Sequence, residues 1–246
     1  MEYEEVQPVS EPIQLTPSES VTHPTPQVSI ETDGSFATAI RDIIRERKPV
    51  HLLETGTHRG TGSTAVICGA IGNNSRLHTV ESNRTFFGCA VANTHKWNYR
   101  VECRWGLSIP RSLLPTYKEV LENIRSCPAD IAIDGAHLPS DELRAQEYVE
   151  ETTVRGSAPE NLIKQIVKTE HDGKIDFVLL DSAGHIGYIE FQHLLNFLEH
   201  PCIIALDDTK HLKHYKSIVA IRRWDKFKIL AEGQDRCGWA ITEYRP

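Results

Sequence analysis

The sequence predicts an α/β domain built on one mostly parallel sheet. Apolar segments that suit buried strands alternate with amphipathic segments that suit helices, and this alternation is typical of right-handed βαβ units. Several apolar segments end in an acid, as in residues 205–208. Because buried strands do not tolerate carboxylates, these acids indicate one sheet edge, where ligands bind in open α/β sheets. The last two apolar segments, separated by residues 232–235, predict a hairpin, so the sheet ends antiparallel.

The first half of the predicted sheet follows an amphipathic helix. Phe36, Ile40, Ile43 and Ile44 recur at helical spacing, and this helix ends before Pro49. Strand, helix, strand, helix and strand are then expected in turn at residues 50–55, 63–71, 77–81, 85–95 and 100–105.

The second half of the chain completes a seven-stranded sheet with helices on both faces. About seventy residues separate its first strand from the preceding one, far more than an ordinary crossover needs. We therefore expect a helical insertion at about residues 112–172, and insertions at the ligand edge commonly form lids or substrate walls. Insertion helices are expected at residues 115–124, 142–149 and 160–169. Strand, helix, strand, helix and hairpin then follow at residues 175–181, 188–198, 202–207, 215–224, and 227–230 with 238–242.

The N-terminal segment, residues 1–33, has a different composition. It holds five prolines and many Ser, Thr and Glu residues, so we expect a disordered tail before a single domain at 34–246. The segment opens with Glu2, Glu4 and Glu5 and has no apolar core, which argues against a secretory signal.

Bulk composition excludes several classes of function. A net charge of −7 over 246 residues argues against nucleic-acid binding through a basic surface, and no apolar stretch reaches the length of a membrane span. The six cysteines form no C-x-x-C pair, so they predict neither a zinc site nor a disulfide framework. We expect a reduced, cytoplasmic protein, and the sequence leaves a homo-oligomer open.

A glycine turn follows the first strand. The spacing of Gly56, Gly60 and Gly62 fits neither the nicotinamide fingerprint nor a P-loop, which needs a lysine that is absent here. Glycine lets a ligand approach the main chain closely, and the N–H groups that open the next helix face the same crevice. An ordinary βα loop is the alternative interpretation. Glu81, which ends the second strand and could accept hydrogen bonds from ribose hydroxyls, favours a nucleotide-like ligand.

Together these features resemble the class I methyltransferases that use S-adenosylmethionine (SAM). That family shows an acid followed by G-x-x-x-G at the first strand and an acid at the end of the second. Glu54, Gly56, Gly60 and Glu81 match this pattern. The resemblance implies a Rossmann-like methyltransferase fold. It covers roughly residues 36–110 and 174–245.

The resemblance also implies a set of cofactor-binding residues. The glycine turn would hold the methionine end of SAM, Glu81 the ribose, and Leu107 with Ser108 the surroundings of the adenine. The full set is Glu54, Gly56, Thr57, His58, Gly60, Gly62, Ser63, Glu81, Ser82, Leu107, Ser108 and Asp181.

Three carboxylates indicate one group within this family. Asp181, Asp207 and Asp208 are similar to the acidic set of metal-dependent O-methyltransferases. Their hard oxygen ligands suit Mg²⁺, which would bind a substrate hydroxyl and lower its pKa. The alternative is that Asp181 is the acid common to the family and that the other two merely cap a loop.

The general base is chosen from several histidines. Residues 181–185 resemble the family's Asp-x-x-His motif with one extra residue, so Asp181 and His185 are the expected catalytic pair. A neutral imidazole can accept a proton near pH 7. His211 and His214 are alternatives, as base or as metal ligands.

A second segment also resembles a catalytic motif. Asp134 and His137 match the Asp-Gly-x-His of sugar and macrolide methyltransferases, but a strand ending at Asp134 would leave Asp207 some seventy residues downstream. We therefore expect these two residues to be a contribution from the insertion.

The sequence thus predicts an enzyme that transfers a methyl group from SAM to a hydroxyl of a small molecule, such as a sugar, a macrolide or a catechol, with Mg²⁺ assisting. The alternatives are a metal-independent methyltransferase of N or C acceptors and a catalytically silent methyltransferase-like module for binding or assembly.

Overall fold

The computed structural model describes residues 30–97, 99–135, 137–153, 157–182 and 184–246. Within these ranges seven strands form one sheet, in the order β3-β2-β1-β4-β5-β7-β6. The strands are β1 (His51–Thr55), β2 (Arg76–Glu81), β3 (Val101–Trp105), β4 (Phe177–Leu180), β5 (Cys202–Asp207), β6 (Phe227–Gly233) and β7 (Trp239–Tyr244).

Strand direction confirms the predicted sheet. Strands β1 to β5 run parallel, whereas β7 lies antiparallel between β5 and β6. The strand order reverses between β1 and β4, where Thr55 pairs with Leu180. A crevice forms beyond the carboxyl ends of the strands at such a reversal, because successive helices leave on opposite faces.

The helices cover both faces of the sheet, as predicted. Because side chains alternate along a strand, the neighbours Leu52 and Leu53 enter different hydrophobic clusters. One cluster packs beneath α1 and α2, and the other beneath α6, η3, α7 and α8. The main-layer helices are α1 (Ser35–Arg47), α2 (Ser63–Ala70), α3 (Arg84–Thr94), α6 (Leu162–Lys164), the π-helical turn η3 (Gln165–Glu170), α7 (Gly187–Leu195) and α8 (Tyr215–Arg223).

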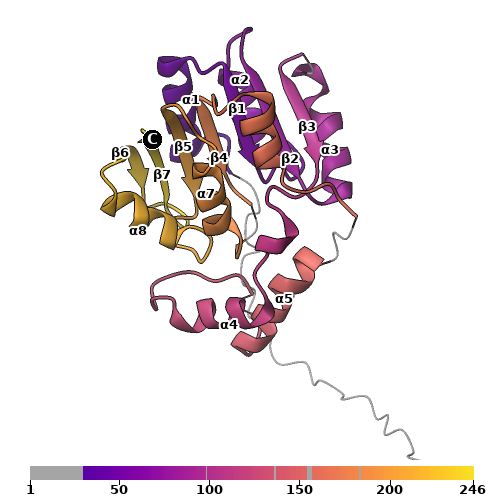
Figure 1. The fold of residues 1–246 in the computed structure, drawn as a ribbon, viewed down its shortest axis with the longest axis vertical. Helices are drawn as coiled ribbons and strands as arrows, with labels where there is room; N and C mark the ends of the chain where they lie inside the picture. The colour runs from indigo at the N-terminus through magenta and orange to yellow at the C-terminus, as the bar shows by residue number, and fades with distance from the viewer. Residues whose placement is uncertain (1–29, 98, 136, 154–156, 183) are drawn as a thin grey trace, which may run out of the picture.

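The insertion forms a separate lobe at one edge of the sheet (Figure 1). Its helices α4 (Tyr117–Ser126) and α5 (Asp141–Thr153) pack on each other around Val120, Ile124 and Tyr148, with Leu212 of the main domain in the same cluster. The third helix that we expected in the insertion, at residues 160–169, corresponds to α6 and η3. Their apolar side chains pack in the sheet core, so they belong to the main layer.

A short backbone pairing fastens the lobe to the domain. Ala132 donates a hydrogen bond to the carbonyl of Lys210 (2.8 Å) and accepts one from the amide of Leu212 (2.9 Å). The loop between β5 and α8 is therefore held by the insertion as well as by the sheet.

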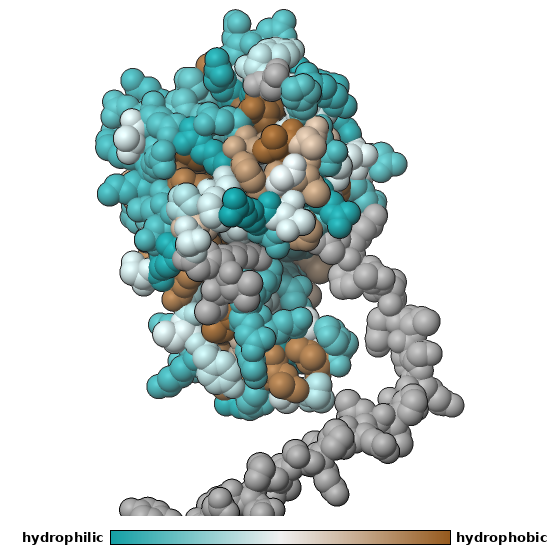
Figure 2. Space-filling model, turned by 90° about the vertical axis from the view of Figure 1, so that its right-hand side faces the viewer, coloured by the Kyte–Doolittle hydropathy of each residue, from teal (hydrophilic) through white to brown (hydrophobic). Residues whose placement is uncertain are grey.

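The surface is mainly polar on the side of β3 and α3, with apolar areas on the sheet-bearing part and on the lobe of α4 and α5 (Figure 2). The exposed apolar side chains around α4 and α5 include Leu113, Tyr117 and Leu143. None of the helices in the described ranges is long and apolar enough to cross a membrane.

Of the expected tail, residues 1–33, positions 1–29 lie outside the described residues and positions 30–33 are described. Ile30 is buried, with 4% of its surface exposed, in the same cluster as Phe36 and Ile40 of α1. Arg41 also donates a hydrogen bond to the carbonyl of Thr32. Residues 30–33 are thus attached to the domain.

We predict that deleting residues 1–29 leaves the melting temperature unchanged, whereas deleting residues 1–33 destabilises the domain. Burial of an isoleucine side chain is worth about 1.5–3 kcal/mol, which the longer deletion forfeits. Chemical denaturation of the two truncated chains measures the difference, and Ile30→Ala in the full chain should reproduce most of it. Equal stability of the two truncations would contradict the assignment of Ile30 to the core.

Candidate active site

A pocket of about 640 Å³ opens beyond the carboxyl ends of β1, β2, β4 and β5. The expected site residues that line it are Gly56, His58, Glu81, Ser82, Leu107, Ser108, Asp181, Asp207 and Asp208. The expected residues outside its lining are Glu54, Thr57, Gly60, Gly62, Ser63 and His185.

The glycine turn is pressed against the loop that follows β4. Gly56 has a φ of +85°, and a Cβ atom there would lie 2.1 Å from the backbone oxygen of Asp181. Only glycine tolerates this combination of a left-handed backbone and a close approach. Gly56 and Thr57 also donate amide hydrogen bonds to the carbonyl of Val80 (3.0 and 3.2 Å), so the turn joins three strand ends.

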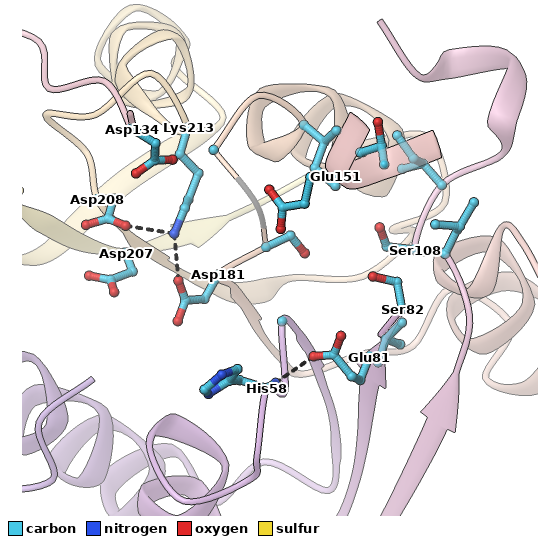
Figure 3. A pocket seen from close by; sticks show the side chains of 18 of the residues that line it. His58, Glu81, Ser82, Ser108, Asp134, Glu151, Asp181, Asp207, Asp208 and Lys213 are labelled. Atoms are coloured by element: carbon cyan, nitrogen blue, oxygen red, sulfur yellow. Dashed lines mark hydrogen bonds and ion pairs between the residues drawn. The ribbon is translucent and has the colours of Figure 1, made fainter. Parts of the chain in front are cut away.

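Glu81, at the end of β2, faces the pocket and holds the loops that follow β1 and β2 (Figure 3). One carboxylate oxygen accepts the amide hydrogen of His58 (2.7 Å), and the other accepts that of Asn83 (2.7 Å) at the start of α3. Glu81 therefore lies at the pocket and holds the loop after β1 together with the loop after β2.

Glu54 lies below the glycine turn rather than in the pocket. It is fully buried and accepts hydrogen bonds from the hydroxyls of Thr64 (2.7 Å) and Thr79 (2.6 Å). Burial raises the pKa of Glu54 to about 7. The side chain therefore positions the turn and the start of α2 from beneath.

The loop after β3 completes this side of the pocket. Leu107 donates an amide hydrogen bond to the carbonyl of Pro159 (2.8 Å), and the carbonyl of Ser108 accepts one from Ile163 (3.0 Å). Residues Leu107 and Ser108, the expected surroundings of the adenine, are thus held by the N-terminal end of α6.

The three acids expected to bind a metal come together at the ends of β4 and β5. One oxygen from each of Asp181, Asp207 and Asp208 lies within 4.8 Å of the others. Asp208 has a φ of +59°, a left-handed conformation that aspartate adopts more readily than most residues. Burial and the charges of Asp181 and Asp208 raise the pKa of Asp207 to about 8.

Lys213 lies within this acidic cluster. Its Nζ donates to Oδ1 of Asp181 (2.8 Å) and to Oδ2 of Asp208 (2.7 Å), and its side chain is only 9% exposed (Figure 3). Burial alone would lower the pKa of Lys213, but the carboxylates raise it above its ordinary value, so the group is an ammonium. Nη1 of Arg236 lies 3.7 Å from Oδ2 of Asp207.

The position of Lys213 bears on the expected Mg²⁺. The three carboxylates offer the hard oxygen ligands that this ion takes. However, an ammonium within 2.8 Å of two of them occupies the position that a shared cation would take. The residues as arranged fit one cation, and Lys213 supplies it.

Of the three histidines considered as bases, only His211 lines the pocket. Its Nε2 lies 3.2 Å from Oδ1 of Asp134, and its Nδ1 accepts the amide hydrogen of Lys213 (3.2 Å). His185 packs against the ring of Tyr148, with 4.9 Å between the ring centroids. His214 is fully buried, and burial lowers its pKa to about 3. The structure thus places His211, rather than the expected His185, in the pocket wall.

The insertion contributes to the pocket wall through Asp134, as the sequence suggested, whereas His137 does not line the pocket. The hydroxyl of Tyr148 on α5 donates to Oδ2 of Asp134 (3.0 Å). Glu151 of α5 also lines the pocket (Figure 3). The lobe therefore forms an acidic wall opposite the loops that follow the strands.

Sequence reasoning also missed Lys213 in the pocket lining and Glu190 beneath it. Lys213 follows the paired acids by five positions, but Lys210 stands in the same segment and no periodicity distinguishes the two. Glu190 of α7 is fully buried and accepts hydrogen bonds from Thr55 (3.2 Å) and Ser182 (2.8 Å), and burial raises its pKa to about 7. An acid on an amphipathic helix gives no sign of such burial.

No protein-family model and no curated protein sequence matches this chain. Solved structures do. The O-methyltransferase TomG from Streptomyces achromogenes, in complex with SAM, matches with a TM-score of 0.54 at 13% identity, over 90% of this chain and 83% of that one. An O-methyltransferase from Bacillus cereus in complex with SAH matches with a TM-score of 0.54 at 13% identity, over 87% of this chain and 83% of that one.

A fungal structure is also similar. The SAH-bound methyltransferase PaMTH1 from Podospora anserina matches with a TM-score of 0.50 at 11% identity, over 85% of this chain and 78% of that one. At such identities the likeness establishes the fold, which is the Rossmann-like fold of class I methyltransferases.

We predict that Glu54→Gln stabilises the domain at alkaline but not at acid pH. The pKa of Glu54 is about 7 in the folded chain and 4.5 ordinarily, so between these values the folded chain keeps a proton that the unfolded chain has released. Rising pH therefore destabilises the wild type across this window, by at most about 3 kcal/mol, and the penalty persists above it.

Urea denaturation at pH 5 and pH 8 measures this effect. The stability of Glu54→Gln relative to wild type should increase between the two pH values. Glu46→Gln, which removes an acid 67% exposed on α1, controls for the loss of one charge. A difference between Glu54→Gln and wild type that does not change with pH would show that Glu54 has no such shift.

Proposed function

We propose that this chain is a SAM-dependent methyltransferase that methylates a hydroxyl of a small molecule. The observation that carries the proposal is the crevice at the reversal of strand order, where Gly56, Glu81 and Ser108 line one side and an acidic cluster lines the other. The fold is one in which similar structures hold SAM or SAH in their own sites.

The residues around the glycine turn fit the methyl donor. Gly56 lines the pocket, and its close approach to the backbone of Asp181 fixes the turn that would hold the methionine end of SAM. Glu81 would accept hydrogen bonds from the ribose hydroxyls, and Leu107 with Ser108 would lie against the adenine. Glu54, Thr57 and Gly60 would support this surface from below.

The acidic wall faces the acceptor. A pocket of about 640 Å³ is within the usual range for small-molecule sites, and its lining of Asp134, Glu151 and His211 suits a hydroxylated molecule. In the reaction the methyl–sulfur bond of SAM breaks with its electron pair remaining on sulfur, the acceptor oxygen bonds to the methyl carbon, and the hydroxyl proton passes to a base.

The candidates for that base lie on the same wall. His211 and the carboxylates of Asp134 and Asp207 all line the pocket. Alignment is the main requirement for an in-line displacement, and the loops fixed by Glu81 and Glu190 provide it.

Two alternatives remain as competing proposals. A methyltransferase of N or C acceptors would use the same donor side with a different acceptor wall. A silent binding module would bind the cofactor and transfer nothing. Mg²⁺ is not part of the proposed function, because Lys213 already neutralises Asp181 and Asp208.

We predict that the full chain binds S-adenosylhomocysteine and that Gly56→Ala weakens this binding by more than about tenfold, or 1.4 kcal/mol. The new Cβ would lie 2.1 Å from the backbone oxygen of Asp181 and would push the turn into the space for the ligand. Isothermal titration calorimetry measures both affinities.

Gly69→Ala is the matched control, since a Cβ at Gly69 of α2 meets nothing within 4 Å. Its affinity should equal that of the wild type. Failure of the wild-type chain to bind S-adenosylhomocysteine would refute the proposal. Binding without transfer of labelled methyl groups to any extract fraction would favour the silent module.

A further inference from the structure

We infer that the ammonium of Lys213 is the resident cation of the acidic cluster, in the position where a metal-dependent methyltransferase would hold a divalent ion. Its role toward the acceptor rests on the proposed function, but its occupancy of the cluster is independent of it. The sequence alone, with its three acids, led us to expect Mg²⁺ instead.

The contacts of the ammonium support this inference. An ammonium has three N–H donors, and Lys213 directs two of them to Asp181 and Asp208. The described residues offer no further hydrogen-bond partner to Nζ, and Lys213 lines the pocket. One donor therefore remains for an oxygen atom of a bound molecule.

The stem of the lysine is held in place by its surroundings. A Cβ on Gly187, at the start of α7, would lie 2.6 Å from Cγ of Lys213 and 2.7 Å from its backbone oxygen. The absence of a side chain at Gly187 thus makes room for the lysine. The backbone amide of Lys213 is also tied to Nδ1 of His211. These contacts oppose withdrawal of the side chain to admit an ion.

The balance of charges also argues against a divalent ion beside Lys213. Asp181, Asp207 and Asp208 carry at most three negative charges, and Lys213 with Arg236 supplies two positive ones at 2.7–3.7 Å. A divalent ion in addition would place four positive charges against three negative ones in a largely buried site. Such an excess of buried like charges is unfavourable.

Lys213 then acts on the acceptor as a hydrogen-bond donor. Its remaining N–H would bind the acceptor oxygen and stabilise the negative charge that develops there as the hydroxyl proton leaves. The ammonium itself stays protonated throughout, because two carboxylates hold its charge.

Binding of Mn²⁺ to the full chain tests the inference, with electron paramagnetic resonance reporting the free ion. We expect no uptake by the wild type up to about 1 mM, the range of weak protein cation sites. Lys213→Met keeps the stem and removes the charge, so it should bind one Mn²⁺ at least about a hundredfold more tightly. Adding Asp208→Asn to Lys213→Met should remove this binding.

Lys210→Met is the matched control, because it removes the same charge from an exposed lysine of the same loop, and it should behave as the wild type. Uptake of Mn²⁺ by the wild type that Asp207→Asn abolishes would overturn the inference. So would a folded Lys213→Met variant, judged by circular dichroism, that gains no binding. Should that variant not fold, the wild-type titration decides alone.

The same samples separate this inference from the proposed function. Calorimetry with S-adenosylhomocysteine reports the donor side of the pocket, with which Lys213 shares Asp181. A wild-type chain that binds neither Mn²⁺ nor S-adenosylhomocysteine would refute the proposed function and leave the assignment of the cation intact.

Discussion

The buried ion cluster of Lys213 with Asp181 and Asp208 is the constraint on which the acceptor side of the pocket depends. Moving such charges out of water costs several kcal/mol for each ion, and only close pairing offsets this cost. The pairing joins the ends of β4 and β5 to the loop before α8, at 2.7–2.8 Å. Loss of one partner would leave the others buried without compensation, at a cost of about 3–5 kcal/mol. The positions of the two strand ends and of the loop before α8 therefore depend on one another.

The two sides of the pocket are built by different means. The donor side relies mainly on backbone geometry, namely the close approach of Gly56 to Asp181 and the amides of His58 and Asn83 that Glu81 accepts. The acceptor side relies mainly on ion pairs and on contacts with the insertion. Ala132 of the insertion pairs with the loop that carries Lys213, and Asp134 contacts His211. A change in the insertion would thus reach the ion cluster through this loop.

This difference explains what the sequence could and could not predict. Alternating apolar segments define the strands, and parallel strands bring their carboxyl ends to one edge, so the positions of Gly56, Glu81 and the three acids follow from the sheet. Lys213 and the choice between His185 and His211 depend on how two irregular loops pack, and local patterns do not encode that. Residues 160–169 were assigned to the insertion because their helical pattern is the same whether a helix packs on the sheet or on another lobe.

A lysine and a divalent ion would select different acceptors. A metal ion with open coordination positions can bind two neighbouring oxygens at once, which suits the vicinal hydroxyls of a catechol. Within the described part of the chain Lys213 pairs with Asp181 and Asp208 alone, which leaves one N–H donor to hold one oxygen. Orientation of the acceptor must then come from other groups on the wall, such as Asp134 and Glu151. Carboxylates accept hydrogen bonds and do not donate them, so under the proposed function an acceptor with several donor groups, such as a polyhydroxylated or amino-bearing molecule, would suit them. Under the proposed function, the sugar-like acceptors suggested by the resemblance would therefore suit this wall better than the catechols.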